Sequence, residues 1–119
     1  MVETPYSIEN GAAALDTLLE AGQPTAVMCA NDVLAVGAMT RAHQLGIRVP
    51  EDLSITGFDD IEIAQIMSPG LTTVHVPHRE MGRRCAQTLI ALRNGQDHTP
   101  IVELRAEIKH RASLSRIGG

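Results

Sequence analysis

The sequence predicts an α/β fold in which a mostly parallel sheet is flanked by helices. Helix-like and strand-like segments alternate along the 119 residues, and two apolar strands run directly into polar clusters. No internal repeat or low-complexity segment interrupts this alternation. With 44% hydrophobic and 20% charged residues, the chain has a globular composition and the length of one domain.

The first helix is predicted after Ser7, a residue type that caps helices well, and Gly22 is expected to end it. Its apolar residues recur with the period of a helix and are Ile8, Ala12, Leu15 and Leu19. The first strand, Ala26–Ala30, is a continuous apolar run, which is typical of a strand covered on both faces.

A second helix is predicted from Asn31-Asp32 to Leu45, with Gly46 as its stop. Gly37 inside this helix costs roughly 1 kcal/mol relative to Ala. We therefore expect a close packing contact at that position. The apolar face of the helix consists of Leu34, Ala38, Ala42 and Leu45.

The middle of the chain predicts two further strands with a short helix between them. Leu53–Phe58 is the second strand, and it follows a connector whose Pro50 cannot sit in a central strand. A short helix is expected over Ile61–Met67. Leu71–Val76 is rich in β-branched residues and is stopped by Pro77, which predicts the third strand.

The last two predicted elements are a long helix over Arg79–Asn94 and a strand over Ile101–Ile108. The helix carries an apolar stripe of Met81, Cys85, Leu89 (or Thr88) and Leu92. Apolar and charged residues alternate in the strand, which predicts a half-exposed strand at a sheet edge. The tail after it shows no core signal beyond Leu114.

The charge and the apolar runs limit the partners of this chain. Its formal net charge of −4 argues against an electrostatic nucleic-acid surface. Arg79, Arg83 and Arg84 surround Glu80, and we interpret them as a solvated helix face. No segment resembles a signal peptide, and no apolar run approaches the roughly 20 residues of a membrane span, so we expect a cytoplasmic protein without a membrane partner.

The two cysteines do not indicate a disulfide framework or a metal site. They form no Cys-x-x-Cys pair, and no histidine has metal-ligand spacing with either. Cys29 lies in a strand-like run and Cys85 in a helical pattern. We expect each to behave as a small buried hydrophobe.

No motif for catalysis is found. The sequence contains no Gly-x-Ser-x-Gly elbow, no glycine loop that cradles phosphate and no Cys/His nucleophile pair. We therefore predict that the protein is not an enzyme and has no catalytic residue and no cofactor. A divalent cation held by Asp59, Asp60 and Glu62 is a minor alternative to an otherwise metal-free chain.

Polar clusters follow the first two predicted strands. Asn31-Asp32 comes directly after the first, and Asp59-Asp60 after the second. In open α/β sheets ligands bind outside the carboxyl ends of the strands, so these side chains can converge on one small molecule. The alternative is that the first cluster only caps a helix and the second only makes a turn.

Four strings of the sequence resemble the LacI/GalR family of bacterial transcriptional regulators, in the order and at the spacing of that family. The strings are PTAVMCAND (24–32), LGIRVPEDLSITGFDD (45–60), LTTV (71–74) and PHREMG (77–82). The resemblance covers about Tyr6 to Ser113. It implies the C-terminal lobe of a periplasmic-binding-protein-like type I fold.

The resemblance also implies an incomplete sensor. Family members carry an N-terminal helix-turn-helix domain that binds operator DNA, followed by a two-lobed sensor with a small effector between the lobes. Residues 1–119 would be the C-terminal fragment of that effector-binding and dimerisation domain, without the helix-turn-helix and most of the N-terminal lobe. This chain would therefore not contact operator DNA itself.

In the family the helix of residues 79–94 packs in the other lobe. Exposing one large apolar side chain forfeits roughly 1.5–3 kcal/mol. We hypothesise that, without that lobe, the helix packs on a second copy to form a homodimer. A second candidate dimer surface comprises Val36, Met39 or Thr40, Ile66 and Met67, although a helix buried on both sides explains Val36 and Met39 equally well.

Residue by residue, the resemblance implies ligand contacts at Tyr6, Asn31 and Asp59. The Asp59 carboxylate would accept hydrogen bonds from sugar hydroxyls or purine nitrogens, and Asn31 offers one acceptor and two donors. Tyr6 would pack on the effector ring. Asp32 is assigned to helix capping and Asp60 to fixing the loop.

One departure from the family lies after the third strand, where some sugar-responsive members have a polar ligand contact and this chain has Val76. The neighbouring His75 and His78 are expected to be ordinary loop histidines. The sequence thus predicts the effector-sensing part of a LacI-type regulator, with a sugar-like or nucleobase-like ligand that modulates operator affinity. The alternative is a solute-binding protein of a sugar transporter, which shares the lobe architecture.

Overall fold

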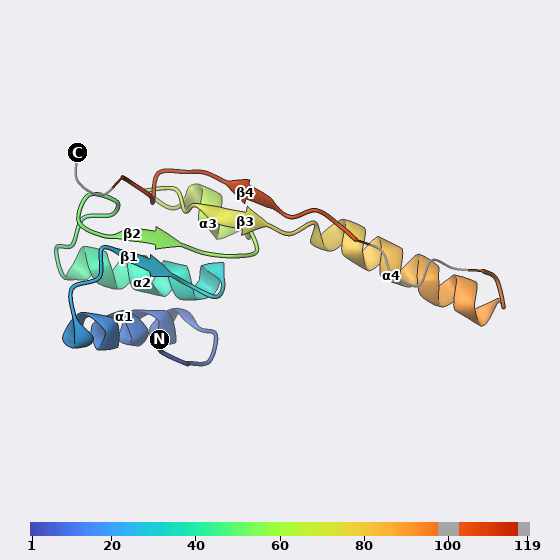
Figure 1. Ribbon diagram of the computed structural model, residues 1–119, viewed down its shortest axis with the longest axis horizontal. Coiled ribbons are helices and arrows are strands. Elements are labelled where there is room, and N and C mark those ends of the chain that lie inside the picture. The colour runs from blue at the N-terminus through green and yellow to red at the C-terminus, as the bar shows by residue number, and fades with distance from the viewer. Residues whose placement is uncertain (98–102, 117–119) are drawn as a thin grey trace. The chain divides into compact units, whose positions relative to one another are not determined.

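Figure 1 shows a computed structural model of the chain, which describes residues 1–97 and 103–116. The chain divides into two compact units. Met1–His75 and Ile108–Gly119 form the first, and Val76–Glu107 forms the second. The order of helices and strands alternates as the sequence predicts.

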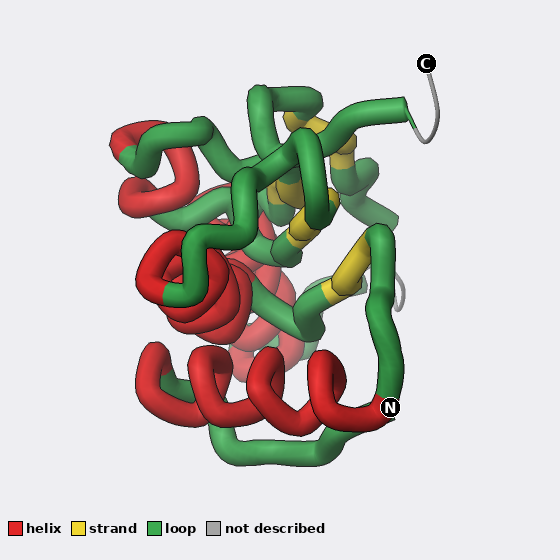
Figure 2. The backbone as a smooth tube through the Cα atoms, turned by 90° about the vertical axis from the view of Figure 1, so that its left-hand side faces the viewer, coloured by secondary structure: helices red, strands yellow, loops and turns green. Residues whose placement is uncertain are grey.

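Helices α1 (Ile8–Ala21) and α2 (Asp32–Gln44) pack against each other in the first unit, as Figures 1 and 2 both show. The predicted cap of α1 is confirmed, because the Ser7 hydroxyl accepts a hydrogen bond from the Asn10 N–H at 3.1 Å. The predicted close contact at Gly37 is confirmed too. A Cβ there would overlap the carbonyl oxygen of Ile8, so the two helix backbones touch.

In the first unit, the strand pair and the single bridges whose direction is known are parallel. The described strands are short: β1 Ala26–Met28, β2 Ser54–Thr56, β3 Thr73–His75 and β4 Glu107–Lys109. β1 pairs with β2 in parallel, and parallel bridges join Thr56 to Thr72 and Asp59 to His75. β3 also pairs with β4. The predicted α/β class with a mostly parallel sheet is confirmed.

The hydrophobic core lies between the helix pair and the strands. Its buried residues are Leu15, Val27, Ala35, Ala38, Met39, Ala42, Leu53, Ile55, Ala64 and Leu71. Val36 and Met39 are only 6% and 4% exposed. α2 is therefore buried on more than one side. This burial accounts for the apolar Val36 and Met39, which do not form a free dimer surface in this chain.

Three sequence expectations about burial are wrong. β1 is not covered on both faces: Val27 is buried, but Met28 is 88% exposed because no described residue covers that side of the strand. Leu45 is exposed because α2 ends at Gln44. Leu45 is the C-cap and no longer belongs to the buried face of the helix. Leu114 is also exposed, and it is Ser113 of the tail that is buried.

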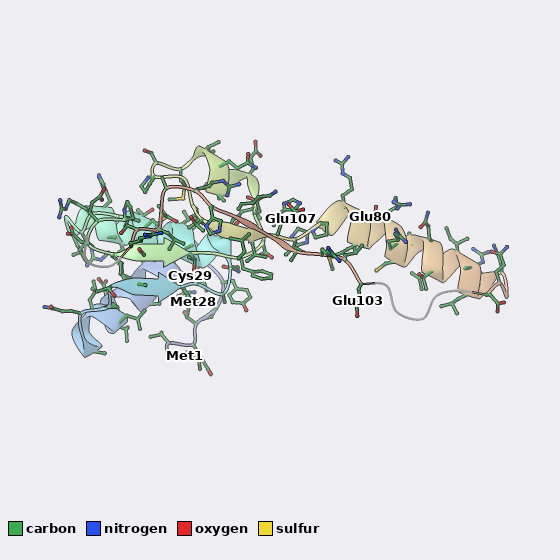
Figure 3. The ribbon with its side chains drawn as sticks, turned by 45° about the horizontal axis from the view of Figure 1, so that its top comes forward. Met1, Met28, Cys29, Glu80, Glu103 and Glu107 are labelled. Carbon is green, nitrogen blue, oxygen red and sulfur yellow. The ribbon has the colours of Figure 1, made fainter. Side chains whose placement is uncertain are left out.

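The remaining helices are α3 (Glu62–Ile66) and α4 (His78–Arg93), close to their predicted ranges. Within the described part of the chain, α4 buries none of its residues. The expectation of a buried Cys85 is therefore wrong. Side chains project from α4 all along its length, with Glu80 labelled near its start in Figure 3.

The charged face of α4 is confirmed as solvated. Glu80 is paired with Arg83 at 2.5 Å and with Arg84 at 2.6 Å. These hydrogen bonds, chiefly the one from Arg83, lower the pKa of Glu80 to about 2. Among the described residues, no helix is both long enough and apolar enough to cross a membrane.

The last predicted strand is shorter than expected. The sequence predicts Ile101–Ile108, whereas the structure has β4 at Glu107–Lys109, since its partner β3 is only three residues long. The start of the predicted range, residues 101 and 102, lies outside the described residues.

Candidate functional site

The two predicted polar clusters lie side by side at one edge of the sheet. β1 and β2 are parallel, so the loops that follow them leave from the same end. The Asp32 N–H donates to the Phe58 carbonyl oxygen at 2.9 Å, which joins the two loops directly. Asn31 and Asp59 therefore stand in adjacent loops, as the sequence predicts.

Asn31, and not Asp32, caps α2. Asn31 has an extended backbone (φ −153°, ψ 173°), and its amide oxygen accepts from the Leu34 N–H at 2.9 Å. The expectation that Asp32 caps the helix is wrong, because Asp32 is already the first residue inside it. The cap uses the amide oxygen of Asn31 and leaves its two N–H donors for another partner.

Asp32 is instead a fully buried hub between three elements. Its carboxylate accepts from the Thr73 hydroxyl at 2.5 Å and from the Ile61 N–H at 2.9 Å. Gly57 must lack a side chain, because a Cβ there would overlap an oxygen of the Asp32 carboxylate. The hub fixes the start of α2, strand β3 and the entry to α3 relative to one another.

The loop after β2 holds an unusual backbone. Asp59 and Asp60 have φ of +111° and +59°, values that side-chain-bearing residues rarely adopt. Such residues cost on the order of 1–3 kcal/mol each and persist where surrounding structure determines them. One determinant is the Asp59 N–H, which donates to the Val74 carbonyl oxygen at 2.9 Å.

A second determinant is the side chain of Asp60, which is only 6% exposed. It binds Arg111 Nη2 at 2.6 Å and His75 Nδ1 at 2.9 Å. Burial alone would raise the pKa of Asp60, but the hydrogen bonds from Arg111 and His75 outweigh it and hold this pKa below its ordinary value. The prediction that Asp60 fixes the loop is confirmed.

Arg111 and Ser113 are the residues that sequence reasoning missed. The Ser113 hydroxyl donates to the Ile55 carbonyl oxygen at 2.6 Å and accepts from the Thr72 N–H at 2.8 Å, which ties the tail to β2 and β3. Neither residue belongs to an apolar pattern. The only available signal was that two hydrogen-bonding side chains follow the last strand.

Tyr6 lies apart from the other two predicted ligand contacts. It is 69% exposed and lines an apolar groove of about 650 Å³ beside α1 and β1. Met1, Met28 and Cys29, all labelled in Figure 3, line the same groove, whereas Asn31 and Asp59 do not. In this chain Tyr6 is thus not gathered with the carboxylate into one pocket.

Near the site, Cys29 is of a residue type that can act as a nucleophile, and the acidic side chains are of a type that can hold a metal ion. Burial, with the nearby charge of Asp32, raises the pKa of the Cys29 thiol to about 11, so it is protonated at neutral pH and a poor nucleophile. Within residues 1–97 and 103–116, no group of three or more His, Cys, Asp or Glu side chains is placed to hold a metal ion. Asp59, Asp60 and Glu62 do not form such a group.

Comparison with known proteins identifies the family of this chain. Residues 1–114 match the family of periplasmic binding protein-like domains. The chain belongs to this family. The HTH-type transcriptional repressor PurR of Vibrio atlanticus is 37% identical to it over 119 residues, which cover 98% of this chain and 36% of that protein. The ribose operon repressor of Haemophilus influenzae is 43% identical over 91 residues, covering 76% of this chain and 27% of that protein.

Solved structures give the same result. A LacI family transcriptional regulator from Enterococcus faecium with bound ribose superimposes with a TM-score of 0.89 at 28% identity, covering 97% of this chain and 43% of that one. The transcription regulator GntR from Chromobacterium violaceum gives a TM-score of 0.87 at 40% identity, covering 92% and 41%. The predicted resemblance to LacI-type regulators is confirmed. The chain spans 36% of the length of the PurR relative.

Proposed function

We propose that this chain is the effector-sensing and dimerisation part of a LacI-type DNA-binding transcription regulator. A small sugar-like or nucleobase-like ligand would bind through Asp59 and Asn31, with Tyr6 brought onto its ring in the whole protein, and would change the operator affinity of that protein. Operator DNA would be contacted by a separate N-terminal domain. The regulators named above favour this function over a transporter's solute-binding protein and over an enzyme.

The observation that carries the proposal is the strained loop at the carboxyl end of β2. Its backbone is held in a rarely populated conformation by bonds from β3 and the tail. Residues in such conformations cluster at ligand-binding sites, where the strain presets a side chain. The residue so presented here is Asp59, and a carboxylate can accept two donors at once.

The chemistry of that carboxylate sets the class of ligand. Two neighbouring hydroxyls of a sugar, or two N–H groups of a nucleobase, offer donors at a spacing that one carboxylate can accept. Ribose is named for two of the similar proteins, which supports the sugar.

The exposed face of α4 supports a partner for the second unit. On one face of α4, Met81, Leu89 and Leu92 are exposed large apolar residues. Within a longer chain this face would pack in the other lobe, and between two copies it would contribute to a homodimer. A regulator that binds operator DNA would act in the cytoplasm.

The experiment is a calorimetric titration of the full-length protein that the gene encodes. The probes are D-ribose, adenine, guanine and hypoxanthine. The test variant is Asp59→Ala, and the matched control is Asp52→Ala, which removes an exposed carboxylate that is paired with Arg48. Losing a hydrogen bond to a charged acceptor costs roughly 1.5–3 kcal/mol, so the Kd of Asp59→Ala should rise about 10- to 150-fold.

The control should bind within about twofold of the wild type, since a surface pair contributes about 0–1 kcal/mol and Asp52 lies in the connector before β2. Equal affinity in Asp59→Ala and wild type would remove Asp59 from the site. Absence of binding for all four probes would contradict the proposed ligand class.

A further inference from the structure

The loop of Asp59 and Asp60 needs more than its own sequence to keep its shape. Two successive residues with side chains have positive φ, and neither is a glycine. A backbone of this kind persists only where neighbouring groups determine it. The question is which groups set the direction of Asp59, the residue to which we assign ligand binding.

Backbone bonds hold the flanks of the loop. The Phe58 carbonyl oxygen accepts from the Asp32 N–H, and the Ile61 N–H donates to the Asp32 carboxylate. Inside the loop, the side chain of Asp60 reaches two other elements, namely β3 through His75 and the tail through Arg111. The bonds to the Asp60 side chain therefore act beside the Asp59 N–H bond to the Val74 carbonyl oxygen in setting the geometry of the loop.

Arg111 is held in place by bonds other than the one to Asp60. Its Nη1 donates to the Leu71 carbonyl oxygen at 2.8 Å, and its backbone N–H donates to the Thr72 hydroxyl at 2.9 Å. Its side chain is 20% exposed and packs beside Gly70. The second arm of the guanidinium, Nη2, then meets Asp60 at 2.6 Å. A lysine cannot make both side-chain bonds, because it lacks the planar fork.

We propose that Arg111 is a positioning residue for effector binding: by gripping Asp60 it holds the Asp59 carboxylate in the direction that the ligand requires. His75 supports the grip from β3. This inference rests on the proposed function, since it assigns Arg111 a role in the same site. Arg111 itself does not contact the ligand.

The first test is amide hydrogen exchange by NMR on the 119-residue chain, which needs no ligand. In Arg111→Met the Asp59 N–H should exchange at least tenfold faster than in the wild type. The Cys29 N–H, which donates to the Thr56 carbonyl oxygen at 2.9 Å in the core, should keep its rate and so report an intact fold. The pKa of the Asp60 carboxyl, followed by its carbon chemical shift, should rise because a bond that lowers it is gone.

The matched control is Arg48→Met. It breaks an exposed Arg–Asp pair of similar geometry, in which Arg48 binds Asp52 at 2.6 and 2.8 Å. Exchange at Asp59 should then stay at the wild-type rate. Arg111→Lys keeps the charge without the fork and should fall between wild type and Arg111→Met. Unchanged exchange at Asp59 in Arg111→Met would overturn the inference.

The second test is a double-mutant cycle on ligand affinity in the full-length protein, with D-ribose as the first probe and the purine bases as the others. Arg111→Met should raise the Kd at least fivefold when Asp59 is present. In an Asp59→Ala background the same substitution should change the Kd by less than twofold, because nothing is left to position. An equal loss in both backgrounds would show a general structural role and overturn the inference.

The two tests separate the possible failures. If the wild type binds none of the probes, the proposed function fails while the exchange measurement still decides whether Arg111 orders the loop. If Arg111→Met unfolds the chain, Asp60→Asn replaces it. That variant keeps an oxygen for Arg111 to bind but loses the charge, and it should speed Asp59 exchange by a smaller factor. No change in Asp60→Asn and Arg111→Lys together would refute the inference.

Discussion

Gly37 allows a prediction in which helix propensity and packing oppose each other. Replacing a glycine inside a helix by alanine normally stabilises the helix by about 0.5–1 kcal/mol. In α2, however, a Cβ at Gly37 would overlap the carbonyl oxygen of Ile8 and lie too close to the Ala12 nitrogen. Both obstacles are backbone atoms of α1, so no side chain can rotate away, and the two helices must separate.

Overpacking of this kind costs typically about 1–3 kcal/mol, and backbone overlap belongs at the upper end. With ~1 kcal/mol returned by propensity, Gly37→Ala should lower the free energy of unfolding by ~2 kcal/mol. For a unit of this size, 2 kcal/mol corresponds to a fall in Tm of ~8–16 °C.

The measurement is thermal unfolding followed by circular dichroism, with Gly82→Ala as the matched control. Gly82 lies inside α4, and no described atom lies within 4 Å of its Cβ position. The control should therefore gain helix content without loss of stability. Equal or higher stability of Gly37→Ala would refute the account of how α1 and α2 pack.

Three further predictions follow from individual groups. Asp32→Ala strands one buried and one half-buried donor and should lower the urea-unfolding free energy by ~2–5 kcal/mol, whereas a change below ~1 kcal/mol would contradict the hub. The pKa of Asp60 is depressed in the folded state, so its stabilisation is present above the ordinary Asp pKa of about 3.9 and is lost as pH falls through the lower folded value. Asp60→Asn should accordingly flatten the fall in stability of the wild type below about pH 4, as measured by urea unfolding, and an unchanged profile would contradict the pairing. Replacing Leu89 and Leu92 by Ser should shift the 119-residue chain from dimer to monomer in sedimentation, and a monomeric wild type would refute dimerisation through α4.

Local sequence signals predicted the fold correctly. The cap at Ser7 and the left-handed stop at Gly46 act within one turn of their own element, and Gly37 stands out because a glycine inside a helix is costly without a close contact. Such residues leave a pattern that a single sequence shows. The parallel sheet followed from alternation of elements, which is also a local property of the chain.

Long-range partners could not be predicted in the same way. Arg111 meets Asp60 across 51 positions, and Ser113 meets Ile55 across 58, without any periodicity that links them. The predictions of which residues are buried failed for a related reason. An apolar stripe indicates that one face of a helix is suited to packing. Whether a residue such as Cys85 is buried, however, depends on whether another element covers that face, and here Cys85 is exposed.

The helix cap lies at Asn31 and not at the predicted Asp32, because the backbone geometry decides which of two neighbouring residues can cap. Both residue types cap helices well, so composition does not separate them. The cap belongs to the residue with extended φ and ψ, and a shift by one position turns the other into a buried hub. The ligand contact of Asn31 stays a prediction, and the cap is compatible with it because it uses only the amide oxygen.

The most direct test of the central proposal joins ligand and DNA in one measurement. Operator DNA is captured from genomic fragments with the full-length protein, and its affinity is measured by fluorescence anisotropy with and without the ligand found by calorimetry. Allosteric coupling of typical size, about 1–3 kcal/mol, predicts a 5- to 150-fold change in DNA affinity for the wild type. In Asp59→Ala, DNA affinity without ligand should be retained and the ligand effect at the same concentration lost. An undiminished ligand effect in Asp59→Ala, or no DNA captured by the wild type, would contradict the account.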